Sequence, residues 1–164
     1  MRVRTATLAD LHDLGAFFLE AWREAGPESP GFTGATEETM RDLASEESLS
    51  AQIMDPLVRV FMAEEGNQIS GFAALRRIDS AAVELSGMMV LQKRVRRGVG
   101  TELFKKAQEF SISEGYRKME VKTEAFNRRA IAFYKKLGFV QSGETEDNLG
   151  GTLVKLMVLQ KSLP

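Results

Sequence analysis

The chain has 164 residues, of which 43% are hydrophobic and 27% charged, with a net charge of −1, no cysteine and the single histidine His12. These values suit one globular domain over 1–164, and they exclude disulfides, a cysteine nucleophile and thiolate or multi-histidine metal sites, so we expect no metal. No apolar run approaches the roughly 18 residues of a membrane helix, and no secretory leader is visible, so we expect a cytoplasmic protein with no membrane partner.

The first third of the chain predicts one strand and two helices. Residues 3–5 form a short strand, and the segment 7–10 offers helix caps. An apolar stripe with helical spacing follows: Leu11, Leu14, Phe17, Phe18 and Trp22. The segment 26–31 (Gly-Pro-Glu-Ser-Pro-Gly) ends this helix. A second, more acidic helix is expected within 36–53.

The middle of the chain is typical of strands. Residues 58–63 and 69–78 flank a Glu-Gly-Asn-Gln turn, which predicts a hairpin. Residues 82–91 form another strand, in which Gly87 indicates a bulge or a close backbone approach.

Two further helices alternate with strands in the last third. One helix buries Val99, Leu103, Ala107 and Phe110 and ends at Gly115; a half-buried strand at 119–123 follows. Asn127 caps a second helix that ends at Gly138, and strands at 139–142 and 152–159 complete the chain. Residues 82–123 form one β-α-β crossover. We therefore predict an α+β fold, an α/β sandwich with a mixed, mostly antiparallel sheet, one parallel crossover and helices on both faces.

The start of the third helix, Val95-Arg-Arg-Gly-Val-Gly-Thr101, has the features of an anion site. A helix N-terminus presents unpaired N–H groups to an anion, and Gly98 and Gly100 allow a phosphate to approach the backbone. Residues 92–106 carry six basic residues and one acidic residue, a balance of +5. The pattern favours a pyrophosphate, although it lacks a Walker lysine and has Leu103 where a dinucleotide fingerprint needs glycine. A basic helix cap without a ligand is the alternative.

Two motifs in this region together resemble those of the GNAT superfamily of acetyl-CoA-dependent N-acetyltransferases. The acetyl-CoA motif, Arg/Gln-x-x-Gly-x-Gly/Ala, corresponds to residues 95–100 after an apolar strand. The second motif corresponds to Asn127, Ala130, Tyr134 and Leu137-Gly138-Phe139. The resemblance spans nearly the whole chain and implies the GNAT acyltransferase fold. Val95 departs from the motif, so charge near the phosphates would come from Arg94, Arg96 or Arg97.

The resemblance implies acetyl-CoA as cosubstrate. Its expected contacts are Met89, Val90, Leu91, Val95, Arg96, Arg97, Gly98, Val99, Gly100, Thr101, Asn127 and Tyr134. In this family a backbone N–H of the bulged strand holds the thioester carbonyl, which by position is that of Met89 or Val90.

Acyl transfer also needs an acid for the departing thiolate and a base for the amine. The resemblance implies Tyr134 as the acid, with core packing as its alternative role. Glu84 is the candidate base, and strand alternation places it on one face with Ser86 and Met88 unless a bulge intervenes. Glu124 competes for this role, and either carboxylate is alternatively a solvated one. His12 is expected on the surface.

We therefore expect an N-acetyltransferase that moves an acetyl group from acetyl-CoA to a primary amine of a small molecule or peptide. The alternative is a catalytically inactive CoA-binding or protein-interaction module. Residues 24–65 hold ten acidic residues against two arginines, a balance of −8, which suits a cationic acceptor. Trp22 and Phe32 border the acceptor pocket or belong to the core. No nucleic-acid partner is expected, and homodimers, common in the family, remain open.

Overall fold

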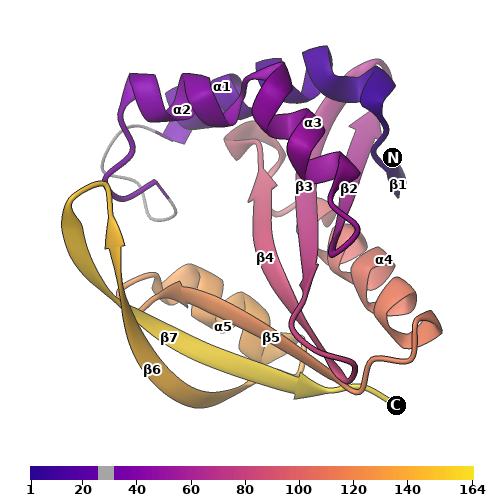
Figure 1. Ribbon diagram of the computed structural model, residues 1–164, viewed down its shortest axis with the longest axis vertical. Helices are drawn as coiled ribbons and strands as arrows, with labels where there is room; N and C mark the ends of the chain where they lie inside the picture. The colour runs from indigo at the N-terminus through magenta and orange to yellow at the C-terminus, as the bar shows by residue number, and fades with distance from the viewer. Residues whose placement is uncertain (26–31) are drawn as a thin grey trace.

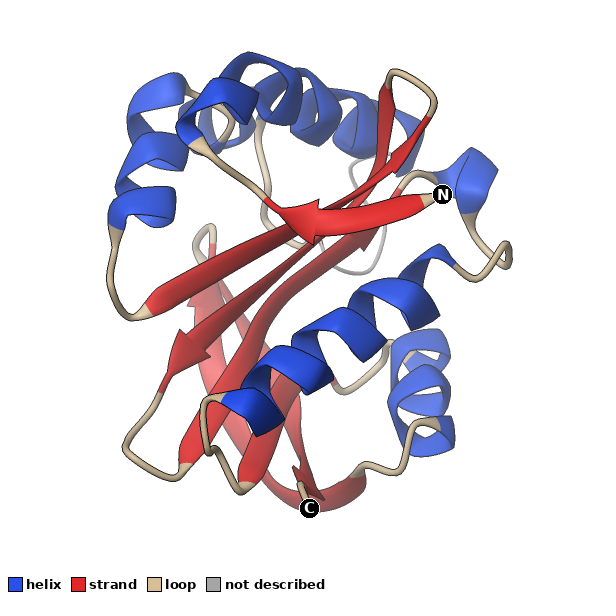
Figure 2. Cartoon of the chain, turned by 90° about the vertical axis from the view of Figure 1, so that its right-hand side faces the viewer, coloured by secondary structure: helices blue, strands red, loops and turns tan. Residues whose placement is uncertain are grey.

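The computed structural model describes residues 1–25 and 32–164, and it places one sheet between two groups of helices (Figures 1 and 2). The strands are β1 (Arg2–Thr5), β2 (Val58–Glu65), β3 (Gln68–Arg77), β4 (Ala82–Val90), β5 (Lys118–Glu124), β6 (Val140–Leu149) and β7 (Thr152–Ser162). The helices are α1 (Leu11–Ala25), α2 (Glu37–Leu43), α3 (Glu46–Met54), α4 (Val99–Ser113) and α5 (Arg128–Lys136), with short 3-10 helices η1 (Leu8–Asp10) and η2 (Gln92–Arg94). The predicted helix breaker at 26–31 lies outside the described residues.

The strands follow the order β1-β2-β3-β4-β5-β7-β6 across the sheet. Every neighbouring pair is antiparallel except β4–β5, which α4 connects as a parallel crossover. This arrangement confirms the predicted fold class. The hairpin turn predicted between β2 and β3 is also present, with Gly66 at a positive φ of 63°.

Two regions differ most from the prediction. The segment 36–53 forms two helices rather than one, because the side chain of Ser45 accepts a hydrogen bond from the Ser48 N–H and starts a new helix. β6 continues to Leu149 instead of ending at 142. Its residues are exposed on both faces, so they show none of the alternation by which a strand is recognised in a sequence. The turn at Gly150 and Gly151, both with positive φ, joins it to β7.

Each face of the sheet has its own apolar core. On one face α4 and α5 pack against the sheet around Val83, Leu85, Leu103 and Phe139. On the other face α1 and α3 pack around Leu14, Phe17, Met62 and Phe72. α4 lies close to β3 at Gly71, where an added Cβ would come within 2.8 Å of the side chains of Val99 and Leu103. Among the described residues no helix is both long and apolar enough to cross a membrane.

A charged network ties the N-terminal strand to the rest of the fold. The guanidinium of Arg4 donates to both carboxylate oxygens of Asp10, at 2.7 and 2.9 Å, and to both of Glu64, at 2.8 and 3.2 Å. Asp10 also accepts from the backbone N–H of Thr7. These charge-assisted hydrogen bonds hold the pKa of Asp10 at about 2, below its usual 3.8.

Candidate active site

β4 and β5 pair only at their amino-terminal ends. Their ladder joins Ala82–Glu84 to Lys118–Glu120 and then stops, although β4 continues to Val90 and β5 to Glu124. Figure 1 shows the two strands diverging from this point. The peptide groups that β4 directs toward β5 beyond Glu84 therefore lack a strand partner. Such a gap can receive an extended chain that hydrogen-bonds as an added strand would.

A bulge in β4 decides which side chains face which helices. The β3–β4 ladder passes from Leu85 directly to Gly87, so Ser86 is the extra residue. Leu85 and Met88 both contact the α4-side core. Glu84 therefore lies on the opposite face from Met88, toward α1–α3. The simple alternation that would put Glu84 and Met88 on one face is wrong here, because the bulge shifts it by one position.

The same ladder shows which backbone groups of β4 point into the gap. The N–H of Leu91 donates to the carbonyl of Ser70 at 3.1 Å, so Leu91 bonds toward β3. Because these directions alternate along an antiparallel strand, Met89 also bonds toward β3, whereas Met88 and Val90 direct their N–H groups toward β5. Of the two positions predicted to hold the thioester carbonyl, this geometry favours Val90, together with Met88, over Met89.

The amino terminus of α4 follows β4 at the open end of this gap. Gly98 is the N-cap in the left-handed conformation, with φ of 83°, and no atom lies within 4 Å of where its Cβ would be. Among the described residues no group accepts a hydrogen bond from the backbone N–H groups of Gly98, Val99, Gly100 and Thr101. These four donors, with the positive end of the helix dipole, form a cradle for an anion.

Only part of the predicted positive charge remains available to that anion. Lys93 pairs with Glu20 at 2.7 Å, and Arg94 pairs with Glu65 at 2.8 Å. Arg96 and Arg97 are exposed and form no ion pair with any described residue. The prediction that Arg94 supplies charge to the phosphates is therefore not supported by its contacts, and neighbouring Lys93 is likewise held by an acidic residue.

Arg96 has an unusual backbone. Its φ of 68° makes it the one non-glycine residue with positive φ among the described residues. A side chain in this region costs roughly 1–2 kcal/mol. Residues in such conformations concentrate at functional sites, where the surrounding structure holds them in place.

Tyr134 lies on α5 and belongs to the α4-side core. Its side chain is 7% exposed, and its ring makes edge-to-face contacts with Phe133 and Phe139. Burial raises the pKa of the Tyr134 hydroxyl from 10 to about 12, so the group stays protonated at neutral pH. The hydroxyl forms no hydrogen bond with a described residue. The tyrosine thus packs in the core and still has a proton to donate, and the two roles predicted for it are compatible.

α5 begins close to the anion cradle. Asn127 caps it by accepting a hydrogen bond from the Ala130 N–H at 3.1 Å. A Cβ added at Gly100 would lie 3.4 Å from the ring of Phe133, so the first turn of α4 packs directly against α5. The two predicted motifs are therefore brought together on the two sides of the β4–β5 gap.

The candidate bases lie on the face of the sheet toward α1–α3. Glu84 is half-buried and pairs in register with Glu120 of β5. The side-chain amide of Gln160 donates to Glu120 at 3.1 Å. Sequence reasoning missed Glu120. The alternation of apolar Met119 and Val121 puts it on the polar face of β5, but only the ladder register shows that it stands beside Glu84.

Glu124 occupies a different position, at the carboxyl end of β5. It is 5% exposed and accepts a hydrogen bond from the hydroxyl of Thr33 in the loop before α2. It is therefore not the solvated carboxylate that was one alternative for it.

The loop before α2 joins three parts of the molecule. Phe32 packs with the α1-side core, Thr33 bonds to β5, and Gly34 touches the β6–β7 turn. A Cβ at Gly34 would overlap the backbone at Leu149, and one at Gly150 would overlap the backbone of Gly34, so this contact is made by main chain alone.

Two further side chains singled out from the sequence belong to α1. His12 is exposed, as expected. Trp22 is half-buried, and its indole Nε1 is covered without a hydrogen-bond partner among the described residues.

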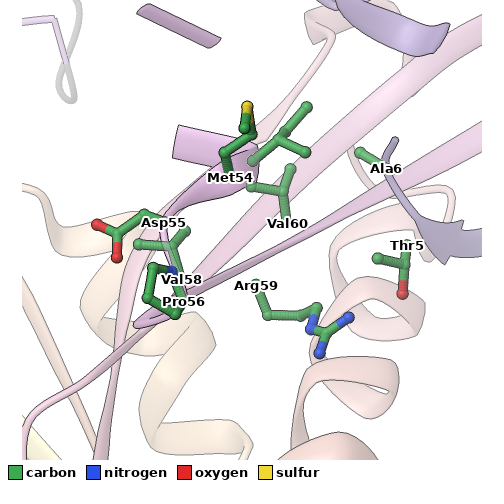
Figure 3. Close-up of a pocket in the computed structure, with 9 residues that line it drawn as sticks. Thr5, Ala6, Met54, Asp55, Pro56, Val58, Arg59 and Val60 are labelled. Carbon is green, nitrogen blue, oxygen red and sulfur yellow. The ribbon is translucent and has the colours of Figure 1, made fainter. Parts of the chain in front are cut away.

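A hollow of about 200 Å³ lies elsewhere, between the end of α3 and the edge formed by β1 and β2 (Figure 3). Its lining includes Thr5, Asp55, Pro56 and Arg59. None of the predicted site residues lines it.

Comparison with known proteins agrees with this geometry. Residues 16–139 match the model of the acetyltransferase (GNAT) family. The chain belongs to this family, and the family predicted from the two motifs is confirmed.

Solved structures share the fold at low sequence identity. The PaiA N-acetyltransferase from Thermoplasma acidophilum, solved in complex with coenzyme A, is 20% identical, with a TM-score of 0.78 over 98% of each chain. The ribosomal-protein-alanine N-acetyltransferase from Brucella melitensis is 23% identical, with a TM-score of 0.76 over 99% of this chain and 100% of that one. The smu.2055 protein of Streptococcus mutans is 20% identical, with a TM-score of 0.79 over the whole of both chains.

Proposed function

We propose that this protein transfers the acetyl group of acetyl-CoA to a primary amine. The observation that carries the proposal is the β4–β5 gap, open along unpaired peptide groups of β4 and ending at the four free N–H donors of α4. An extended amide-containing arm with a diphosphate at its end fits these two features together. The coenzyme A complex of a structural neighbour supports this choice.

The chain's own residues fit acetyl-CoA. The α4 cradle, with Arg96 and Arg97, would hold the diphosphate, and Met88 and Val90 would bond the arm. The predicted contacts Val95, Val99, Thr101 and Asn127 would lie around these groups, whereas Leu91 is fully buried and directs its N–H toward β3. When bound, acetyl-CoA supplies an acetyl group activated as a thioester.

Three groups of this chain would act on the reaction. The N–H of Val90 or Met88 donates to the carbonyl oxygen, on which negative charge develops. Tyr134 holds a proton that it donates to the departing sulfur. Glu84, on the face opposite to the α4-side core, accepts the proton of the attacking amine, directly or through water.

The acidic residues of α2, α3 and β6 favour a cationic amine as the acceptor. α2 and α3 begin with paired glutamates, Glu37-Glu38 and Glu46-Glu47, all four exposed or partly exposed. The outer strand β6 adds Glu144, Glu146 and Asp147; of all these carboxylates, Glu37 pairs with Arg41 and Glu144 pairs with Lys155. A surface of this sign raises the local concentration of ammonium-bearing acceptors, both small polyamines and basic peptides.

The proposal is tested by following thiol release from acetyl-CoA across a panel of amines and basic peptides. The chain has no cysteine, so it contributes no thiol to the signal. Acceptor-dependent release that disappears in the Arg96→Glu, Gly98→Glu double variant supports the proposal. Calorimetry with acetyl-CoA separates the failures: tight binding without transfer to any acceptor favours a non-catalytic CoA-binding module, and absence of binding overturns the proposal.

A further inference from the structure

The connection between β5 and α5, together with the first turn of α5, presents an aromatic ring and two arginines to solvent. The side chain of Phe126 is 55% exposed, which is unusual for so large an apolar group. Arg128 and Arg129 follow it, both exposed. Their guanidinium groups form no ion pair or hydrogen bond with any described residue. Neither packing nor internal charge pairing accounts for these three side chains.

Topology places this connection beside the anion cradle. β4 and β5 are the parallel pair of the sheet, so the loops that follow their carboxyl ends meet at one edge. Arg129 and Phe133 are four positions apart on α5 and share one face of the helix. Phe133 packs against Gly100 in the first turn of α4. Arg129 therefore lies about 6 Å along α5 from that contact, on the side toward the cradle.

Arg128 differs from its neighbour in this respect. It is one residue earlier, which rotates its side chain by about 100° around the helix axis, away from the face shared by Arg129 and Phe133. Arg128 and Arg129 thus have the same charge and are both exposed, but only Arg129 lies on the face of α5 that packs against the cradle.

The charges of coenzyme A leave a role for such residues. Its diphosphate carries two negative charges, and its 3′-phosphate monoester carries a further charge of about −1.5 to −2. The α4 cradle with Arg96 and Arg97 accounts for the diphosphate. The 3′-phosphate and the adenine ring lie beyond it, where they need a cation and a flat apolar surface.

Building on the proposed function, we infer that Arg129 binds the 3′-phosphate of acetyl-CoA and that Phe126 is the surface on which its adenine stacks. Arginine matches the geometry of a phosphate through two parallel hydrogen bonds. Stacking of a base on an exposed aromatic ring is a common source of nucleotide affinity. The nucleotide end of the cosubstrate is thus held by Phe126 in the β5–α5 connection and by Arg129 in the first turn of α5.

The test measures the Kd of three ligands by calorimetry: acetyl-CoA, 3′-dephospho-acetyl-CoA and S-acetyl-4′-phosphopantetheine. Arg129→Gln is expected to weaken acetyl-CoA about tenfold and to leave the two ligands without the 3′-phosphate unchanged. Phe126→Ala is expected to weaken both adenine-containing ligands about tenfold and to leave S-acetyl-4′-phosphopantetheine unchanged. Arg128→Gln is the matched control and should bind all three ligands as the unmodified protein does.

Ligand dependence separates recognition from a structural effect. Equal losses for all three ligands, or no loss for any, overturn the inference, as does a loss in Arg128→Gln that equals the loss in Arg129→Gln. A raised KM for the amine with unchanged Kd values would assign Phe126 to the acceptor instead and also overturn it. Failure of the unmodified protein to bind acetyl-CoA is a different result, since it refutes the proposed function itself.

Discussion

Glu84 and Glu120 stand side by side in the last rung of the β4–β5 ladder, with both side chains on the face toward α1–α3. Beyond this rung the strands separate, so the two carboxylates mark the closed end of the gap. Gln160 bonds to Glu120, whereas no described group bonds to Glu84. This difference is the reason that we propose Glu84, rather than Glu120, as the base.

We expect Glu84→Gln to lower kcat by about 100-fold, because general-base catalysis contributes roughly 10²–10⁴ in rate. Acetyl-CoA binding should not change. Glu120→Gln is the matched control on the neighbouring strand, and it should lower kcat less than about tenfold. Steady-state kinetics with calorimetry check both variants. A larger loss in Glu120→Gln than in Glu84→Gln would move the base to β5.

Tyr134→Phe should lower kcat by about 100-fold and leave the Kd of acetyl-CoA within about twofold, since only the hydroxyl is lost from a ring that stays packed. Stopped-flow measurement of thiol release follows the turnover, and titration with acetyl-CoA gives the Kd, so the two effects are measured separately. Phe133→Leu, which alters the neighbouring ring, is a control for packing. If Tyr134→Phe turned over at the normal rate, Tyr134 would be a core residue only.

The raised pKa of Tyr134 also predicts how stability depends on alkaline pH. Burial keeps this phenol protonated up to about pH 12 in the folded protein, whereas the unfolded chain ionises it near pH 10. Below pH 10 both states hold the proton, so there is no effect. Between pH 10 and 12 the unfolded state alone loses it, and the free energy of unfolding should fall by about 1 kcal/mol by pH 11. Urea unfolding at pH 9 and pH 11 measures this change. In Tyr134→Phe the fall in the free energy of unfolding between these two pH values should be smaller by about 1 kcal/mol.

Arg96→Gly should have opposite effects on stability and binding. Glycine relieves the left-handed backbone, so the free energy of unfolding is expected to rise by up to about 1 kcal/mol after its greater unfolded entropy is deducted. Loss of the guanidinium should weaken acetyl-CoA about tenfold. Arg97→Gly, at a position without positive φ, should weaken binding without stabilising. Thermal unfolding and calorimetry measure both effects. A destabilised Arg96→Gly would contradict the assignment of strain.

The Arg4–Asp10 pair predicts an acid-sensitive contribution to stability. Hydrogen bonds from Arg4 lower the pKa of Asp10 to about 2 in the folded protein, against 3.8 in the unfolded chain. The stabilisation, about 1–2 kcal/mol, is present above pH 4 and is lost as the pH falls toward 2. Urea unfolding from pH 6 to pH 2 should show a shallower acid decline in Asp10→Asn. Asp13→Asn, an exposed carboxylate on α1, should retain the full decline.

Much of this fold could be predicted because its helices and inner strands have clear apolar patterns. α1 and α4 each bury one recognisable face, β5 alternates apolar and polar residues, and β2 and β3 are apolar runs buried on both faces of the sheet. The split between α2 and α3 and the length of β6 could not be predicted in this way. A single side-chain cap at Ser45 decides the first, and β6 has no buried face to reveal it.

The site was predictable where it depends on local sequence and not where it depends on register. Gly98 and Gly100 indicate an anion-binding cradle in the sequence itself, because glycine leaves the local backbone open to a ligand. The acidic partners of Lys93 and Arg94 lie 73 and 29 residues earlier in the chain. The sequence therefore could not show that ion pairs hold these two basic side chains away from the candidate anion site. The bulge at Ser86 likewise becomes visible only in its pairing with β3.

The contact between Gly34 and Gly150 has a consequence for how this protein could diversify. Two segments more than a hundred positions apart in the sequence touch there through backbone only. Any side chain at either position would act as a spacer and push the β6–β7 hairpin away from the loop before α2. A single codon change at either glycine would thus move this hairpin in one step, without changing any residue of the α4 cradle.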